Sequence, residues 1–537
     1  MAIPNTRAIA GDPYEGASRL AAGTALWTPA LRSADSELVG ARDLGNARAR
    51  DVLRNDAYVA AGVAVHRDSI VGSQFLLNAK PHARMLGLDE TWEREFQEEV
   101  EAKFTLYAES PECWLDARRV NTLTGMLRLA VVAYVYGGEV LATVEWMSRE
   151  RRRPYRTALQ LIEAERLCNP YASEYNVYNY KERGGIERDD FGRPLWYNIR
   201  NGHPSDGSFN SIQFRRVPAR LPWGRVQVIH ILEPMRIDQT RGISELVSGL
   251  KQLRYRNQYE EVVLQNAIVS ATFAATIESE LPQQAADVFG VDGEDPAVQA
   301  ADEYINAVSG FTENTSALRI NGVKIPHLYP GSKLEIRPAG SNSALGNDFE
   351  RSMLRHLAAN LGMSYEELSR DYSKTNYSSA RAAMVQTWKF MQARKKVVAD
   401  RFATHAYRLW LEEAINAGAL ETARSVPNIY EGQNFDALSS CEWLGASRGQ
   451  IDEFKETQAA AERIAKGLST YEIELGRLGL DWRSVFAQRQ REREEMEARG
   501  IAPPAPAAPA EQAGQGGPDD GTAQEEQTEE DRSAESE

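Results

Sequence analysis

The chain has 537 residues, 42 % of them hydrophobic, and a formal net charge of -15. This hydrophobic fraction is sufficient for buried cores, so the composition excludes a chain that is disordered throughout. Ten acidic residues and one Arg lie in 501–537, which leaves 67 acidic and 61 basic residues in the rest of the chain. The near balance argues against tight, sequence-independent DNA binding, because such binding depends on phosphate neutralisation by Lys and Arg.

The first half of the chain divides into two regions. Residues 1–43 mix Gly, Pro, Ser and Ala with little periodicity, and we expect a partly mobile arm there. Residues 44–242 combine helical and strand patterns and predict a mixed α/β region. Helices are expected at 54–72 and 88–109, and short strands at 73–81, 138–147, 157–167 and 224–233.

The middle of the chain predicts two long helices on either side of a small domain. Residues 243–277 carry regularly spaced apolar residues without a proline, which is typical of a long helix. Residues 278–343 predict a compact αβ subdomain, because the Asn321-Gly322 pair stands between β-prone runs and indicates a hairpin. A second helix is expected at 344–362, with Gly362 as its C-terminal stop.

The polar segment 363–378 leads into a third helix. Ser364 begins a capping-box pattern for one short turn. The third helix is expected over 379–417, and we assign Ser378 and Ser379 as its caps, with Asn376 as a further candidate.

Two more helices are expected in 418–500. The Pro-, Gly- and Glu-rich segment 501–537 predicts disorder. The overall prediction is an α+β fold that is predominantly helical.

Several kinds of chemistry are not indicated. The three cysteines lie far apart without a Cys-x-x-Cys spacing, and the seven histidines fall in seven separate segments, so we expect no metal site. There is no phosphate-binding G-x-x-x-x-G-K-[ST] loop, and we expect neither a cofactor nor ATP hydrolysis. The most apolar stretch, 127–146, is interrupted by Gly137, Gly138 and Glu139, so no membrane span is expected.

One motif could suggest an enzyme. The sequence "GASRG" places Ser447 in the G-x-S-x-G pattern of a serine nucleophile. The last histidine, His405, precedes Ser447, whereas a hydrolase of this type requires a histidine after the serine. A serine hydrolase is therefore only a remote alternative to a loop that enters the next helix.

Two basic clusters could contact phosphates. The first contains Arg151, Arg152 and Arg153, and its alternative interpretation is a solvated hairpin tip. The second contains Lys395 and Lys396 on the third helix, where long basic side chains often cover a packed apolar surface instead.

A series of motifs in a fixed order carries a family resemblance. They include "ARDLGNARARDVLRNDAYVAAG", "VIHILEPMRIDQTRGISEL", "LGMSYEELSRDYSKTNYSSARAAMVQTWKFM" and "WLGASRGQIDEFKETQAAAERIAKG". Together they resemble the portal proteins of lambda-like tailed bacteriophages, from about residue 40 to about residue 500. The order of the motifs is more specific than any one of them.

The resemblance implies a non-enzymatic ring of twelve subunits with an axial channel, which occupies one vertex of the capsid. Double-stranded DNA would be packaged through this channel by the terminase motor, retained, and later ejected into the tail. Each subunit would have a mixed wing at 44–242 that includes the helix 379–417. A stem of two helices would lie at 243–277 and 344–362, with a clip at 278–343 and a helical crown at 418–500.

The resemblance also implies partners and a place in the particle. The expected partners are identical subunits, DNA bound without sequence specificity, the terminase large subunit, the head-tail adaptor, and the major capsid and scaffold proteins. The protein would be assembled in the cytoplasm of the bacterial host and reside in the virion, without a membrane. A head-tail connector or minor capsid protein that lacks a DNA channel is the main alternative.

The polar segment 363–378 corresponds to the tunnel loop of such a ring. Its hydroxyl groups, amide and lysine could contact a DNA backbone briefly without reading bases. We name its central residues the channel segment and predict that they face DNA, with Lys374 as the main phosphate contact: Asp371, Tyr372, Ser373, Lys374, Thr375, Asn376 and Tyr377.

Overall fold

The computed structural model describes most of the chain. The described residues are 15–17, 23–24, 26–38, 40–148, 152–170, 181–207, 212–272, 306, 319–320, 323–324, 343–373, 375–447, 449 and 453–501. Two units are distinguished, 1–481 and 482–537. Most of the expected clip, and the expected acidic tail after Ile501, lie outside the described residues.

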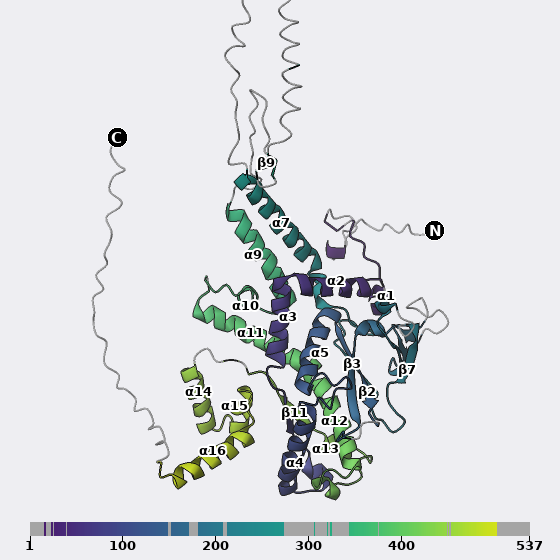
Figure 1. Ribbon diagram of the computed structural model, residues 1–537, viewed down its shortest axis with the longest axis vertical. Coiled ribbons are helices and arrows are strands. Elements are labelled where there is room, and N and C mark those ends of the chain that lie inside the picture. The colour runs from purple at the N-terminus through teal and green to yellow at the C-terminus, as the bar shows by residue number, and fades with distance from the viewer. Residues whose placement is uncertain are drawn as a thin grey trace, which may run out of the picture. The chain divides into compact units, whose positions relative to one another are not determined.

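Among the described residues, five N-terminal helices precede or enter the main apolar core of the first unit, and the last four of them contribute buried side chains to it (Figure 1). They are α1 (Ala34–Leu38), α2 (Arg42–Asn55), α3 (Ala57–Ile70), α4 (Glu90–Ala108) and α5 (Leu123–Gly137). The side chains of Asp56, Asp89 and Thr122 cap α3, α4 and α5 by accepting hydrogen bonds from free backbone N–H groups. Because α5 is apolar on most of its surface, it is buried on nearly all sides.

Within the described ranges, four small antiparallel sheets accompany these helices. The first has the order β3-β2-β8, formed by Thr157–Ile162, Glu139–Trp146 and Val228–Leu232. The second is the meander β4 (Glu182–Arg183), β5 (Ile186–Arg188), β6 (Pro194–Arg200) and β7 (Phe214–Pro218). The third joins β1 (Leu76–Ala79) to β11 (Cys441–Leu444). The fourth pairs β9 (Arg319–Ile320) with β10 (Val323–Lys324), in agreement with the predicted hairpin.

The expected first stem helix begins later than predicted. Ser244 caps a 3-10 turn at Glu245–Ser248, and the helix α7 then runs over Leu250–Thr272. The expected second stem helix corresponds to α9 (Ser343–Asn360), which packs beside α7 (Figure 1). The rings of Tyr259 and Phe349, one from each helix, lie 4.9 Å apart.

The expected third helix is nearly continuous. It consists of α11 (Tyr377–Lys395), a π-helical turn at Lys396–Asp400, and α12 (Arg401–Asn416). Phe402, Tyr407 and Trp410 of α12 are fully buried, and Trp410 lies 5.2 Å from the ring of Phe104 on α4. The third helix therefore supplies a large part of the apolar core.

The region after α12 is less purely helical than predicted. It contains the 3-10 turn Thr422–Ser425, α13 (Asn434–Leu438), strand β11, α14 (Glu453–Ala465) and α15 (Tyr471–Arg477). Strand β11 returns to the core, where Trp443 stacks on Phe75 with ring centroids 5.5 Å apart. The second unit contains α16 (Trp482–Ala498).

Within the described part of the chain, no helix is long and apolar enough to span a membrane.

Candidate functional site

The candidate site begins at the C-terminal end of α9. Gly362 has a φ of +67°, and the backbone N–H of Met363 donates to the carbonyl oxygen of Ala358 at 3.0 Å. A Cβ atom at Gly362 would lie 2.4 Å from the ring of Phe390 on α11. The predicted helix stop is confirmed, and the absence of a side chain also lets α9 end against α11.

The predicted capping box follows immediately. Ser364 caps α10 (Tyr365–Ser369): its Oγ accepts from the Glu367 backbone N–H at 3.2 Å, and the Glu367 carboxylate accepts from the Ser364 N–H at 3.1 Å. The hydroxyl of Thr387 on α11 donates to the same carboxylate at 2.5 Å. The capping box is therefore confirmed, and it also attaches α10 to α11.

The channel segment is a compact turn in its described part. The Asp371 carboxylate accepts hydrogen bonds from the Ser373 N–H at 3.1 Å and the Ser373 hydroxyl at 2.6 Å. The Thr375 hydroxyl donates to Glu366 at 3.3 Å. Tyr372 is half-exposed, and burial of its hydroxyl raises its pKa, so the phenol is neutral at neutral pH. Lys374 and the side chain of Tyr377 lie outside the described residues.

The cap of the third helix differs from the assignment to Ser378 and Ser379. Asn376 is the N-cap, because its side-chain oxygen accepts from the Ser379 backbone N–H at 2.8 Å. Ser378 and Ser379 lie inside the first helical turn and do not cap it. The backbone of Asn376 is extended, so its side-chain oxygen reaches the backbone N–H three residues later. Asn376 therefore takes the capping position that was assigned to the two serines.

The first basic cluster does not form one surface. Arg152 is exposed, whereas Arg151 lies outside the described residues. Arg153 is buried, and its guanidinium group donates to the carbonyl oxygen of Tyr155 at 2.7 Å and to that of Trp114. Arg153 therefore supports the fold of the loop between β2 and β3.

The second basic cluster divides in the same way. The Lys395 ammonium group is buried and donates to the Asp400 carboxylate at 2.7 Å and the Trp443 carbonyl oxygen at 2.8 Å. Lys396 is 75 % exposed at its side chain and lies 3.7 Å from Asp400. The structure favours the packing alternative for Lys395, while Lys396 remains accessible.

The structure reveals a buried polar cluster that sequence reasoning did not find. The Arg394 guanidinium group donates to both carboxylate oxygens of Glu245 at 2.5 and 2.6 Å, and to Nδ1 of His66 at 3.2 Å. Nε2 of His66 lies 2.8 Å from the Leu361 carbonyl oxygen at the end of α9. Because Nδ1 accepts, Nε2 carries the proton of a neutral imidazole.

This cluster connects four parts of the fold. His66 belongs to α3, Glu245 precedes α7, Leu361 follows α9, and Arg394 belongs to α11. Burial first, and the positive charge of Arg394 second, lower the pKa of His66 to about 3. We name these four residues the junction cluster; no local pattern identifies it, because its members are far apart in the sequence.

A second buried cluster holds the sheet β3-β2-β8 against the segment before α7. The Glu139 carboxylate contacts Arg241, Arg42, His230 and the Gly242 N–H, with His230 at 3.0 Å. Burial alone would raise the pKa of Glu139, but Arg241 and His230 hold it well below its ordinary value. His230, which lies on β8, therefore has a structural partner.

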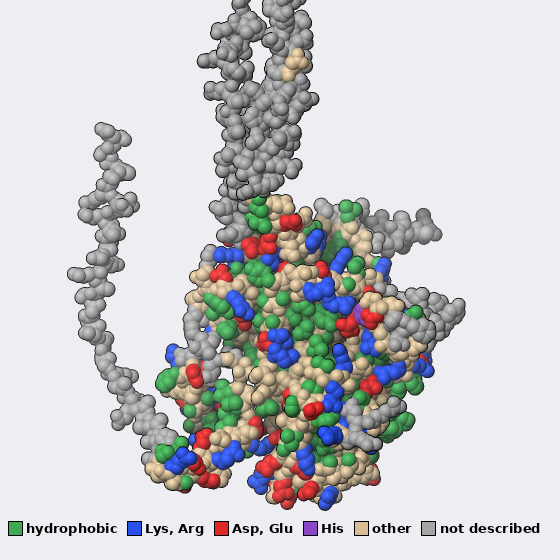
Figure 2. All heavy atoms as spheres, in the orientation of Figure 1, with side chains coloured by type: hydrophobic (Ala, Val, Ile, Leu, Met, Phe, Trp, Pro, Cys, Tyr) green, Lys and Arg blue, Asp and Glu red, His purple; other side chains and the backbone are tan. Residues whose placement is uncertain are grey.

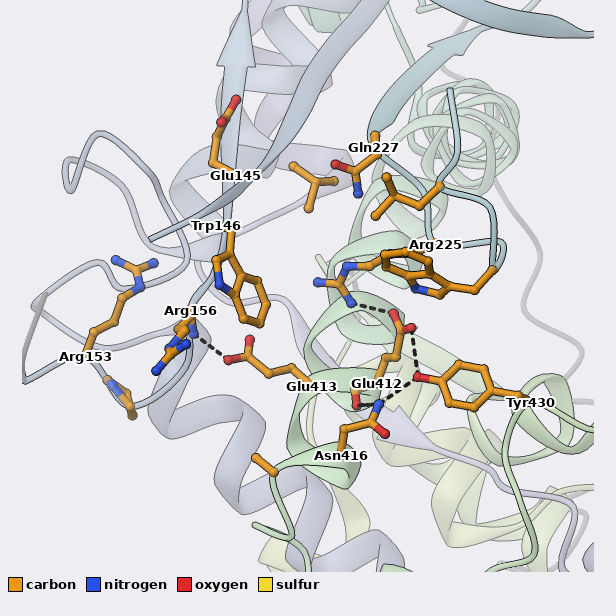
Figure 3. A pocket seen from close by; sticks show the side chains of 15 residues that line it. Glu145, Trp146, Arg153, Arg156, Arg225, Gln227, Glu412, Glu413, Asn416 and Tyr430 are labelled. Carbon is orange, nitrogen blue, oxygen red and sulfur yellow. Dashed lines mark hydrogen bonds and ion pairs between the residues drawn. The ribbon is translucent and has the colours of Figure 1, made fainter. Parts of the chain in front are cut away.

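A cavity of about 810 Å³ that resembles a ligand site lies between β2 and α12. Figure 3 shows Trp146 and Tyr430 on either side of it, with Glu412 between them. Glu412 pairs with Arg225, and Glu413 accepts from the backbone N–H groups of Arg156 at 2.6 Å and Thr157 at 2.8 Å. These carboxylates already have internal partners, so they act as structural groups.

Ser447, the candidate nucleophile, lies at the edge of a small cavity. It lines a cavity of about 240 Å³ together with Glu367, Thr387, Trp388 and Glu456. No histidine is among the described residues that line this cavity. A serine nucleophile requires an adjacent general base, so the hydrolase alternative gains no support.

Comparison with known proteins gives a consistent assignment. A family model described as phage portal protein, lambda family, matches residues 21–395. Over 483 residues, the chain is 37 % identical to the portal protein of Escherichia phage N15 and 36 % identical to portal protein B of Escherichia phage lambda. Both alignments cover 89 % of this chain and 89 % of the relative.

Among solved structures, the neck of an empty gene transfer agent particle, computed with C6 symmetry, gives a TM-score of 0.40 at 14 % identity. It covers 81 % of this chain and 93 % of the other. Because the family model matches well over half of the chain and the two phage relatives align over nearly all of it, the chain belongs to the lambda family of phage portal proteins.

Proposed function

We propose that twelve copies of this portal protein form a ring at one capsid vertex, through which double-stranded DNA is packaged, retained and ejected. The observation that carries this proposal is the extent of the similarity, which covers 89 % of the chain and of each phage relative. The terminase motor would supply the energy for packaging. The role of this protein would be structural: a conduit and a docking platform for the terminase large subunit, the adaptor, and the capsid and scaffold proteins.

The arrangement of the helices supports the division into wing, stem, clip and crown. Two packed helices, α7 and α9, flank the expected clip at 278–343, which is the order expected of a stem hairpin that bears a clip. In a ring, such hairpins would line up side by side and form a tube. The wing would comprise 44–242 and the third helix, and the crown 418–500.

The surface charge suits a channel through which DNA moves without being bound tightly. Figure 2 shows Lys and Arg interspersed with Asp and Glu on the visible face of the described residues. Basic side chains in such a mixture give individual phosphate contacts that salt weakens, instead of a continuous binding surface. The channel segment, with exposed Tyr372, Ser373 and Asn376, would provide brief contacts at the narrowest point.

Lys374 is the residue that we propose for direct phosphate contact. Replacing Lys374 with Glu is expected to leave ring assembly intact and to reduce the yield of particles that package and retain a full genome. Lys389→Glu, the same charge change at an exposed position of α11, is the control. Full-length packaging by Lys374→Glu at the wild-type level would remove the argument for Lys374.

Electron micrographs of the purified protein test the main proposal. Rings with a central hole of about 20 Å or more, the width of a DNA duplex, are expected. Monomers or solid particles would instead favour a connector or minor capsid protein without a DNA channel.

A further inference from the structure

A short apolar segment near the N-terminus is exposed on its own subunit. In residues 26–31, which we call the arm segment, Leu26 is 99 % exposed, Trp27 is 72 % exposed and Leu31 is 103 % exposed. Proteins rarely leave three large apolar side chains so fully exposed within six residues of chain. The segment therefore has the character of an anchor for another surface.

The chain beyond the arm segment is firmly held by the body of the subunit. The Arg236 guanidinium group donates to the Arg32 carbonyl oxygen at 3.0 Å and pairs with Glu37. The buried Asp35 carboxylate accepts from the Thr240 N–H at 2.8 Å. The arm segment thus leaves the subunit from a fixed point at Arg32.

An open groove of about 990 Å³ lies between α2 and the start of α7. Its apolar lining comes from Leu44, Val52, Val247, Leu250 and Tyr255, of which Leu44 is 55 % and Tyr255 53 % exposed. Charged residues of α2 and α7 complete the lining: Arg48, Asp51, Lys251 and Arg254. None of the described residues that line the groove belongs to the arm segment.

A ring constrains how such surfaces combine. Identical subunits in a ring meet head to tail, so each copy presents one surface to the preceding subunit and a different surface to the next. An exposed apolar arm and an apolar groove on the same chain satisfy this requirement. A groove of this size is also in the range that accommodates a few large side chains.

We propose that the arm segment of one subunit binds in the groove between α2 and α7 of its neighbour, with Trp27 as the principal anchor. A few residues usually contribute most of the binding energy of an interface, and tryptophan is enriched among them. This inference rests on the proposed ring, but it specifies which segments of adjacent copies meet. A second copy of this chain is the only occupant proposed.

Disulfide trapping tests the contact directly. The double variant Trp27→Cys/Leu44→Cys is oxidised mildly and separated on a non-reducing gel. A ladder of dimers and larger products is expected, since every subunit both donates an arm and accepts one. Each single variant and the wild-type chain, which contains Cys113, Cys168 and Cys441, serve as controls. Disulfide formation within monomers only, or no disulfide at all, would overturn the inference.

Ring formation gives a second readout. Trp27→Ser/Leu31→Ser is expected to reduce the fraction of subunits found in rings at least about tenfold at limiting concentration, where one decade corresponds to about 1.4 kcal/mol. Phe191→Ser is the matched control, because Phe191 is 97 % exposed and outside both surfaces. Wild-type levels of rings in the arm variant would refute the arm contact alone. Failure of the wild-type protein to form rings would refute the proposed function instead.

Discussion

Gly362 and Gly418 provide a matched pair for measuring how α9 is held against α11. Both end a helix with a φ of +67°. A Cβ atom at Gly418 would meet nothing within 4 Å, whereas at Gly362 it would lie 2.4 to 2.7 Å from three ring atoms of Phe390. Substitution by alanine therefore imposes the same backbone strain at both positions and a steric clash at only one.

The expected costs follow from these two terms. A non-glycine residue in the left-handed helical region costs about 1–2 kcal/mol. Forcing an additional methyl group into a packed contact costs about a further 1–3 kcal/mol. Gly418→Ala should then lower the free energy of unfolding by about 1–2 kcal/mol, and Gly362→Ala by about 2–5 kcal/mol.

Urea unfolding followed by tryptophan fluorescence measures both costs. Adding Phe390→Leu to Gly362→Ala is expected to recover at least about 1 kcal/mol, because the smaller side chain relieves the clash. Equal costs for the two glycine variants, or no recovery with Phe390→Leu, would show that the contact between Gly362 and Phe390 does not hold α9 in place.

The junction cluster and Ser447 give the remaining predictions. Arg394→Met should destabilise the fold by about 2–4 kcal/mol, because it leaves the Glu245 carboxylate without its partner. Arg394→Lys should not restore stability, since one ammonium group cannot replace the bidentate pairing of a guanidinium group. The midpoints of urea unfolding test both variants. With a pKa near 3 in the folded protein against about 6.5 when unfolded, His66 makes stability fall as the pH drops through this interval. His66→Gln should flatten that part of the stability profile, and an unchanged slope would contradict the assignment of a neutral, buried His66. A serine-reactive phosphonate is expected to leave Ser447 unmodified; labelling that Ser447→Ala abolishes would contradict the non-enzymatic role.

Features that depend on a few neighbouring residues were predictable from the sequence. The stop at Gly362, the capping box at Ser364 and the hairpin around Asn321-Gly322 all agree with the structure. The long third helix was also predicted, because its apolar spacing persists over ten turns or so. The 3-10 turn before α7 was missed, and Asn376 was only a further candidate for the N-cap, since adjacent residues offered equally good local signals.

The environment of the charged side chains was decided only by the tertiary structure. Lys395 and Lys396 are neighbours in sequence, yet one is buried against Asp400 and Trp443 and the other is exposed. Arg394 likewise depends on Glu245 and His66, which lie well over a hundred residues away. A charge can be buried only where other segments provide its partners, so such sites emerge only after the chain has folded. The sequence by itself determined the order of the helices, because helix periodicity, caps and turns are encoded locally. It also determined the family, because its motifs follow one another in a fixed order.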